Sequence, residues 1–190
     1  MRAALLLAPG AGAGRDQSTL VAIDAAATAR GAVVERMDFP YRKAGRKAPD
    51  REPVLLAAVR AEIDLLVDRS GLELSRLVMG GRSMGGRMCS MAAAGGLDVL
   101  GLVLISYPLH PPGRPEKLRT AHFPDRTMPC LFVSGTRDAF GAPAELEAAT
   151  GAIPGPVTHV WVDGKDHALR NVDDRVAGAV VTWLEQVAGT

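Results

Sequence analysis

The sequence has little cysteine, almost no net charge and no long apolar run, and each shortage argues against a class of protein. Its two cysteines, Cys89 and Cys130, lie in apolar surroundings. Such cysteines are typical of buried small side chains rather than of a disulfide framework or a metal site. The formal net charge is +1, so the chain has no electrostatic basis for binding nucleic acid or an anionic membrane.

The apolar runs are also too short to span a bilayer, which takes about 18 or more apolar residues. Residues 1–8 resemble the start of a secretory signal, but Pro9 and Gly10 end the apolar run early. We interpret this stretch as the first strand of a domain instead. The expectation is a cytoplasmic protein without a membrane partner.

What the sequence does contain is a regular alternation of strand and helix patterns. Hydrophobic residues make up 47% of the 190 residues, which suits one domain over residues 1–190 with a single core. Runs without polar alternation indicate strands covered on both faces. The expected strands are residues 3–8, 33–39, 75–79, 99–105, 129–134 and 157–162, and the expected helices are 17–30, 52–69, 84–94, 144–150 and 172–187. This order predicts an α/β fold with about six mostly parallel strands flanked by helices.

A serine turn follows the third expected strand. Gly81-x-Ser83-x-Gly85 fits the nucleophile elbow, a sharp strand-to-helix turn that presents a serine at the edge of a parallel sheet. The turn needs small neighbours, because the serine backbone is strained and a Cβ at either flanking glycine would clash. The pattern alone is weak, but an apolar strand precedes it and a helix-forming stretch follows.

A serine hydroxyl needs a base to take its proton and an acid to orient that base. In folds that use this elbow, the acid follows a later strand and the histidine follows the last one. Asp138 comes after the strand 129–134, and His167 comes after the strand 157–162. We therefore predict a catalytic triad of Ser83, Asp138 and His167.

Other titratable residues compete for these roles. His159 falls inside a strand, and His110 and His122 precede the acid in the chain. Asp163 and Asp166 lie too close to His167 in sequence to occupy a separate strand end, so turn formation is their expected role.

The oxyanion hole of such a site combines the N–H after the nucleophile with an N–H from the loop after the first strand. The first donor is Met84. The loop after the first strand is rich in glycine, which lets its amides approach a bound oxyanion, and we nominate the N–H of Ala11.

The same loop permits a second interpretation, a dinucleotide site. A strand, then Gly10-x-Gly12, then a helix and a strand carrying Asp38 imitates that fingerprint. The third glycine of the pattern would fall at position 15, which is Arg15, and this hypothesis leaves the serine, acid and histidine unexplained.

Two segments interrupt the alternation. Residues 41–50 are basic and contain glycine and proline, so they are predicted to form an exposed loop. The proline-rich segment, residues 107–115, cannot form regular structure because prolines lack the donor and restrict φ. It follows a strand at the edge of the sheet where ligands bind. We predict that Tyr107, Leu109 and His110 border the substrate pocket, with a rigid connector as the alternative.

Basic residues follow the proline-rich segment. Arg114, Lys117 and Arg119 are expected to form a solvated edge.

These motifs together resemble a known group, small α/β-hydrolases without a cap domain that are related to the dienelactone hydrolases. The resemblance rests on residues 9–12, 81–87, 107–113, 135–138 and 166–167. It implies the α/β-hydrolase fold over nearly the whole chain. The sequence departs from the group at Pro9, where a histidine is usual, and from the dienelactone hydrolases proper in offering Ser83 in place of a cysteine nucleophile.

The sequence thus predicts a serine hydrolase that cleaves a small ester, thioester or lactone, with no metal or organic cofactor implied. The expected partner is the small-molecule substrate. The group also resembles a hydrolase-like domain of a chromatin-complex subunit, so the alternative is a binding module that keeps the fold without turnover.

Overall fold

The computed structural model describes residues 3–189, so Met1 and Arg2 of the signal-like stretch lie outside the described residues. Six strands form one parallel sheet in the order β2-β1-β3-β4-β5-β6. The strands are β1 (Ala4–Ala8), β2 (Val33–Arg36), β3 (Leu77–Arg82), β4 (Gly101–Ile105), β5 (Cys130–Gly135) and β6 (Val157–Val162).

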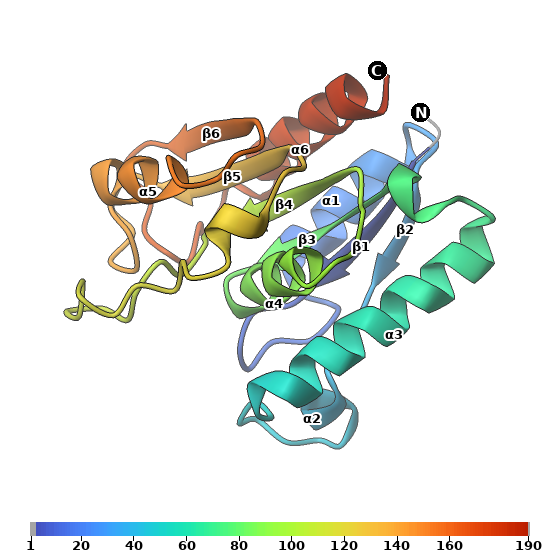
Figure 1. The fold of residues 1–190 in the computed structure, drawn as a ribbon, viewed down its shortest axis with the longest axis horizontal. Coiled ribbons are helices and arrows are strands. Elements are labelled where there is room, and N and C mark those ends of the chain that lie inside the picture. The colour runs from blue at the N-terminus through green and yellow to red at the C-terminus, as the bar shows by residue number, and fades with distance from the viewer. Residues whose placement is uncertain (1–2, 190) are drawn as a thin grey trace.

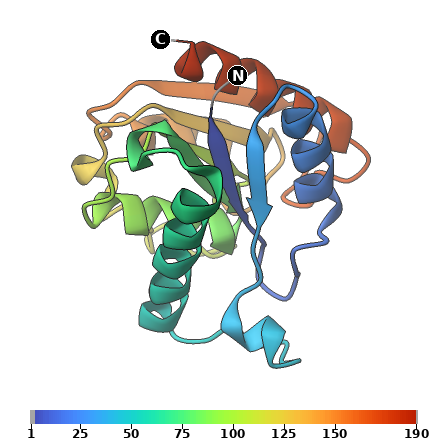
Figure 2. The same cartoon turned by 90° about the vertical axis from the view of Figure 1, so that its right-hand side faces the viewer.

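Helices cover both faces of this sheet (Figures 1 and 2). They are α1 (Ser18–Thr28), α2 (Pro40–Lys43), α3 (Glu52–Ser70), α4 (Met84–Ala94), α5 (Pro143–Thr150) and α6 (Asp173–Ala188), with short 3₁₀ turns η1 (Leu74–Arg76) and η2 (Phe123–Asp125). Apolar side chains of α3, α4 and α5 pack in one layer with half of the strand residues. Those of α1 and α6 pack in the other. Successive strand residues point to opposite faces, so Leu6 joins the first layer while Leu5 and Leu7 join the second.

The strand order places the loop after β1 beside the elbow after β3. The chain runs outward from β1 to β2 and then returns to pair β3 on the other side of β1. The carboxyl ends of β1 and β3 therefore flank the point where the direction of winding reverses, the usual ligand crevice of such sheets. The connection from β4 to β5 contains only η2, so no cap domain covers this crevice.

The prediction of an exposed loop over residues 41–50 is wrong at its start. Pro40 opens the one-turn helix α2, because its fixed φ suits the first helical position. The turn carries Tyr41 inward, and its side chain is fully buried. The ring stacks on Phe39 at a centroid distance of 6.3 Å. The remaining residues of the segment are largely exposed.

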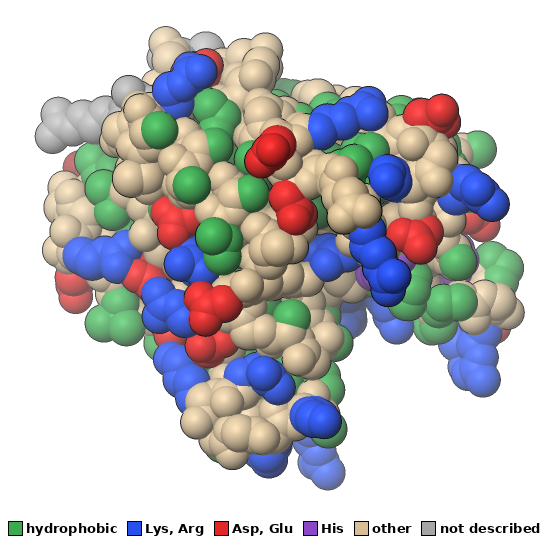
Figure 3. All heavy atoms as spheres, turned by 180° about the vertical axis from the view of Figure 1, so that it is seen from behind, with side chains coloured by type: hydrophobic (Ala, Val, Ile, Leu, Met, Phe, Trp, Pro, Cys, Tyr) green, Lys and Arg blue, Asp and Glu red, His purple; other side chains and the backbone are tan. Residues whose placement is uncertain are grey.

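Acidic and basic side chains are interspersed over the upper part of the face seen from behind, whereas the lobe at its lower end shows mainly Lys and Arg (Figure 3). Among the ion pairs of the surface, Arg36 pairs with Asp24 at 2.8 Å. Within residues 3–189, no helix combines the length and apolar character that crossing a membrane requires.

Candidate active site

Ser83 lies at a strained turn between β3 and α4. Its φ of 50° and ψ of −115° fall outside the regions that non-glycine residues favour. The flanking glycines permit this turn to pack against β1. A Cβ added at Gly81 would come within 2.0 Å of the Ala8 carbonyl oxygen, and one at Gly85 within 2.3 Å of the same atom. The sequence-based expectation that only small residues fit beside the serine is thus confirmed.

The structure brings Ser83, His167 and Asp138 together. Ser83 Oγ lies 2.9 Å from His167 Nε2. His167 Nδ1 lies 2.8 Å from Asp138 Oδ2 and 3.0 Å from Oδ1. A carboxylate only accepts hydrogen bonds, so Nδ1 carries the proton and Nε2 is free to accept one from the serine. The Asp138 side chain is 1% exposed and that of His167 22%, so the acid is shielded while the base reaches solvent.

A close approach of two loops makes the contact between histidine and acid possible. A Cβ at Gly135 would come within 2.1 Å of the Lys165 carbonyl oxygen. The Arg137 N–H donates to that same oxygen at 2.9 Å. The loop after β5, which carries Asp138, is therefore hydrogen-bonded directly to the loop after β6, which carries His167.

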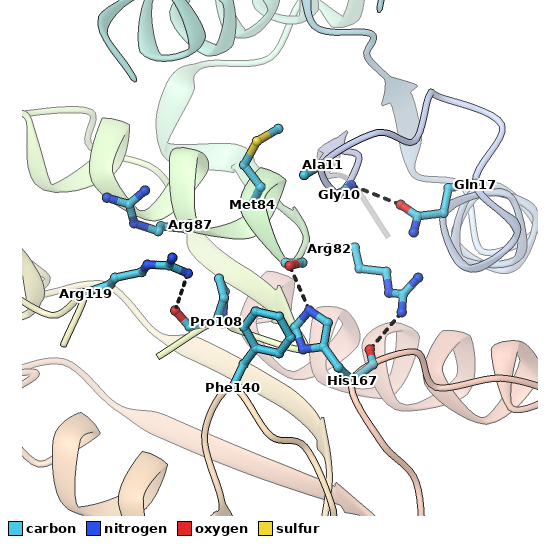
Figure 4. A pocket seen from close by; sticks show the side chains of 11 residues that line it. Gly10, Ala11, Gln17, Arg82, Met84, Arg87, Pro108, Arg119, Phe140 and His167 are labelled. Carbon is cyan, nitrogen blue, oxygen red and sulfur yellow. Dashed lines mark hydrogen bonds between the residues drawn. The ribbon is translucent and has the colours of Figure 1, made fainter. Parts of the chain in front are cut away.

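Two residues that the sequence analysis missed hold the histidine in place. The Phe140 ring packs on the imidazole with a centroid distance of 4.0 Å, and its N–H donates to Asp138 Oδ1 at 2.8 Å. Arg82 Nη2 donates to the carbonyl oxygens of His167 and Ala168 at 2.8 and 2.6 Å. Figure 4 shows Phe140 alongside His167, with Arg82 on the opposite side. Their only sequence signal is adjacency, two residues after Asp138 and one before Ser83.

Ala11 and Met84, the two nominated oxyanion donors, both line the pocket that contains Ser83. Met84 opens α4, where the first N–H groups of a helix have no intrahelical acceptor. Neither amide donates a hydrogen bond within the described residues. Both donors are therefore free to bind an oxyanion.

The amides on either side of Ala11 are already engaged. The Gly10 N–H donates to Gln17 Oε1 at 3.1 Å, and the Gly12 N–H donates to the Tyr41 hydroxyl at 3.2 Å. The loop after β1 is thus held at both neighbours while the Ala11 N–H stays unpaired. Sequence reasoning missed Tyr41 because it assigned this residue to an exposed loop.

The pocket around Ser83 has a volume of about 450 Å³, and its proline-rich wall differs from the prediction. Pro108 lines it, whereas Tyr107, Leu109 and His110 do not. Those three side chains are buried instead, at 1%, 0% and 5% exposure. The placement of Tyr107, Leu109 and His110 at the pocket is therefore wrong. The Tyr107 ring packs instead against Phe123 and Phe132, at centroid distances of 5.5 and 5.9 Å.

The position of Arg119 also differs from the prediction. The sequence predicts a solvated edge formed by Arg114, Lys117 and Arg119, and the first two are indeed exposed. Arg119 is half-buried and lines the pocket instead.

The competing histidines lie outside this pocket. His159 bonds to Thr150 Oγ1 at 2.9 Å and stacks on Trp161. His110 Nε2 lies 3.5 Å from Glu145. His122 Nε2 lies 2.7 Å from Ser90 Oγ.

The competing acids have local or bridging roles. Asp166 closes a turn by accepting from the Ala168 N–H at 3.0 Å, as expected. Asp163 lies in a turn, and its carboxylate also accepts from Thr136 Oγ1 of the loop after β5 at 3.1 Å. Asp38, the acid of the dinucleotide hypothesis, accepts from the Arg15 N–H at 2.8 Å. Its carboxylate thus closes the loop after β1, where a dinucleotide site would use it to hold a ribose.

The fold and the elbow together define an α/β protein with a serine at the turn between a strand and a helix. Comparison with protein families leads to the same class of protein. A model described as an alpha/beta hydrolase domain matches residues 1–181. The chain belongs to this family, and it is a small member without a cap domain.

Solved structures show the same fold. Est1E from Butyrivibrio proteoclasticus superposes with a TM-score of 0.82 at 15% identity, covering 99% of this chain and 89% of that one. An alpha-beta serine hydrolase homologue from Coxiella burnetii gives 0.80 at 16% identity, covering 97% and 86%. The esterase domain of a Rhodothermus marinus protein gives 0.74 at 18% identity, covering 97% and 87%.

Proposed function

We propose that this protein is a serine hydrolase that cleaves a small ester, thioester or lactone through an acyl-enzyme intermediate. The observation that carries the proposal is the hydrogen-bonded chain from Ser83 through His167 to Asp138. It opens into a pocket lined also by Ala11 and Met84, whose amides donate no hydrogen bond within the described residues. Membership of the hydrolase family supports the same activity.

In this mechanism Ser83 Oγ attacks the carbonyl carbon while His167 Nε2 takes the hydroxyl proton. The carbonyl π bond opens to an oxyanion, which the amides of Ala11 and Met84 stabilise. Collapse of this intermediate breaks the bond to the alcohol or thiol, which leaves with the proton from His167.

Water completes the cycle. His167 takes a proton from the water, whose oxygen attacks the acyl carbon. The acid product leaves as the proton returns to Ser83. Asp138 keeps the imidazole in the required tautomer and stabilises the imidazolium that forms twice per cycle. No step requires a metal or an organic cofactor.

Covalent labelling with a fluorophosphonate probe tests the proposal, because an unactivated serine does not react. Wild-type protein should be labelled at Ser83, as located by peptide mass spectrometry, and Ser83→Ala should not. Ser90→Ala is a matched control, because Ser90 also contacts a histidine but is fully buried. Absence of labelling, together with no turnover of p-nitrophenyl acetate or butyrate, would contradict the proposal and favour a binding module.

A further inference from the structure

The pocket around Ser83 is positively charged. Three arginines line it, Arg82, Arg87 and Arg119, and none of its lining residues is an aspartate or glutamate. Unpaired guanidinium groups in a half-enclosed site cost desolvation free energy unless an anion compensates them.

Arg82 is engaged through its Nη2, which points to the loop that carries His167, although its Nε is buried without a partner. It donates to the carbonyl oxygens of His167 and Ala168, and the charges of Asp173, Asp138 and Asp166 act on it. We therefore assign Arg82 to the support of the loop that carries His167. Arg87 and Arg119 remain as candidates for binding a ligand.

Arg119 has no carboxylate partner within the described residues. Its one side-chain hydrogen bond is a long one, from Nη1 to the Pro108 carbonyl oxygen at 3.4 Å. Burial lowers the pKa of this guanidinium, and the charge of Arg87 lowers it further. The two cations therefore repel each other.

Arg87 is only partly compensated. Its Nη2 lies 2.8 Å from Glu52, whose side chain is 44% exposed and does not line the pocket. The Nε of Arg87 is buried without a partner. Figure 4 shows Arg87 and Arg119 together on one side of the pocket, with His167 across from them.

The backbone of Arg119 is fixed where it enters the pocket. Its N–H donates to the Leu109 carbonyl oxygen at 2.8 Å, and its carbonyl oxygen accepts from the Tyr107 hydroxyl at 2.7 Å. Both partners are buried. Two core residues thus hold the backbone of this arginine at the site.

We propose that Arg87 and Arg119 bind an anionic oxygen group of the substrate, a carboxylate or a phosphate, at the end away from the scissile bond. Guanidinium groups match such anions with paired N–H donors. The inference rests on the proposed hydrolase function and specifies its substrate class, an ester or thioester that carries a negative charge.

Matched substrates test this inference. The p-nitrophenyl monoester of glutaric acid carries a carboxylate, its glutaramate analogue replaces that group by a neutral amide of similar size, and p-nitrophenyl 4-phosphonobutanoate carries a phosphonate. We expect wild-type kcat/KM for at least one anionic ester to exceed that for the amide by about tenfold to a hundredfold. The preferred anion identifies the group that is recognised. Added salt should shrink the ratio.

Variants assign the preference to the two arginines. Arg119→Gln should reduce the anion-to-amide ratio by about tenfold, and Arg119→Lys should retain part of it because the charge remains. The double variant Arg87→Gln/Glu52→Gln removes the second cation without leaving Glu52 unpaired. Arg114→Gln is the control, because Arg114 lies nearby in sequence but is exposed outside the pocket, and it should leave the ratio unchanged.

The outcomes separate this inference from the proposed function. If the fluorophosphonate probe labels Ser83 but the ratio is near one, or is unaffected by Arg119→Gln, the hydrolase remains and the anion site is wrong. If no ester is cleaved and no probe reacts, calorimetric binding of glutarate and of inorganic phosphate decides. Binding weakened about tenfold by Arg119→Gln but not by Arg114→Gln would support the anion site alone. Equal or undetectable binding in all three proteins would overturn it.

Discussion

Two serine–histidine pairs lie within residues 3–189, and their surroundings differ. Ser83 and His167 are 2.9 Å apart at the pocket, and Ser90 and His122 are 2.7 Å apart outside it. Distance alone would favour the second pair. The comparison shows that two features decide whether a serine hydroxyl can act as a nucleophile. They are the charge of the group next to the serine–histidine pair and the access of substrate to the serine.

His167 contacts the carboxylate of Asp138, whereas the Ser90–His122 pair contacts the guanidinium of Arg126. Arg126 Nη1 donates to Ser90 Oγ at 2.9 Å, and its guanidinium lies 3.8 Å over the Phe123 ring. Burial lowers the pKa of His122 to about 4, and the charges of Arg126 and Arg87 act in the same direction. An imidazolium there would meet positive charge, so His122 is a poor proton acceptor.

Access differs as well. Ser90 is fully buried, whereas Ser83 lines an open pocket. The buried arginine is held by the aromatic ring and the Ser90 hydroxyl. The Ser90–His122–Arg126 cluster is therefore structural, a polar network that satisfies part of a buried cation.

The largest expected effect separates the two serines by activity. Ser83→Ala should reduce kcat for p-nitrophenyl acetate by at least about 10³-fold, because it removes the nucleophile. Its melting temperature should not fall, because the substitution removes no core contact. The strained turn loses only a hydroxyl group.

Ser90→Ala is the counterpart. It should leave kcat within a few-fold of wild type but lower the free energy of unfolding by about 1–3 kcal/mol, because a buried guanidinium loses its hydrogen-bond acceptor. Urea unfolding of both variants measures this. A large loss of activity in Ser90→Ala without a loss of stability would erase the distinction between the pairs.

A smaller effect tests the carboxylate behind His167. Asp138→Asn should reduce kcat by about 10²- to 10⁴-fold, because an amide can stabilise the wrong imidazole tautomer. Asp166→Asn is the matched control, since Asp166 only closes a turn through the Ala168 N–H. Steady-state kinetics on both variants would refute the assignment if Asp166→Asn were the more damaging change.

Acidification should act on the Ser90–His122 pair through the stability of the fold. His122 resists protonation in the folded state, with a pKa of about 4, against about 6.5 in the unfolded chain. Between these values the unfolded state binds the extra proton, so stability is lost as pH falls from about 6.5 towards 4.

The variant His122→Gln checks this prediction. Glutamine does not titrate, so its free energy of unfolding should decline less than that of wild type between pH 7 and pH 4.5. Urea unfolding at both values measures the difference. Parallel curves for the two proteins would show that His122 carries no such linkage.

The comparison also shows what a sequence can reveal. Ser83, Asp138 and His167 each follow a strand in a fixed chain order, and apolar runs and glycines locate strand ends well. The six parallel strands were predictable for the same reason. The periodicity of apolar residues locates the strands and helices, and these three residues lie where the strands end.

Residues that act from one loop on another were not predictable. Tyr41 reaches the loop after β1 from α2. Arg119 lies at the pocket because its backbone is hydrogen-bonded to the Leu109 carbonyl oxygen and the Tyr107 hydroxyl. Neither contact follows from spacing along the chain, because it depends on how an irregular segment returns to the sheet. The wrong placement of Tyr107 and Leu109 has the same origin.

The smallest expected effect concerns one such contact. Tyr41→Phe removes the hydroxyl that accepts the Gly12 N–H but retains a ring that can stack on Phe39. Loss of one hydrogen bond loosens the loop that presents the Ala11 amide, so kcat should fall about two- to tenfold with KM little changed. A free energy of unfolding close to that of wild type would separate positioning from stability. Unchanged kcat would mean that the Gln17–Gly10 contact holds the loop by itself, and Gln17→Ala would then be expected to produce the loss.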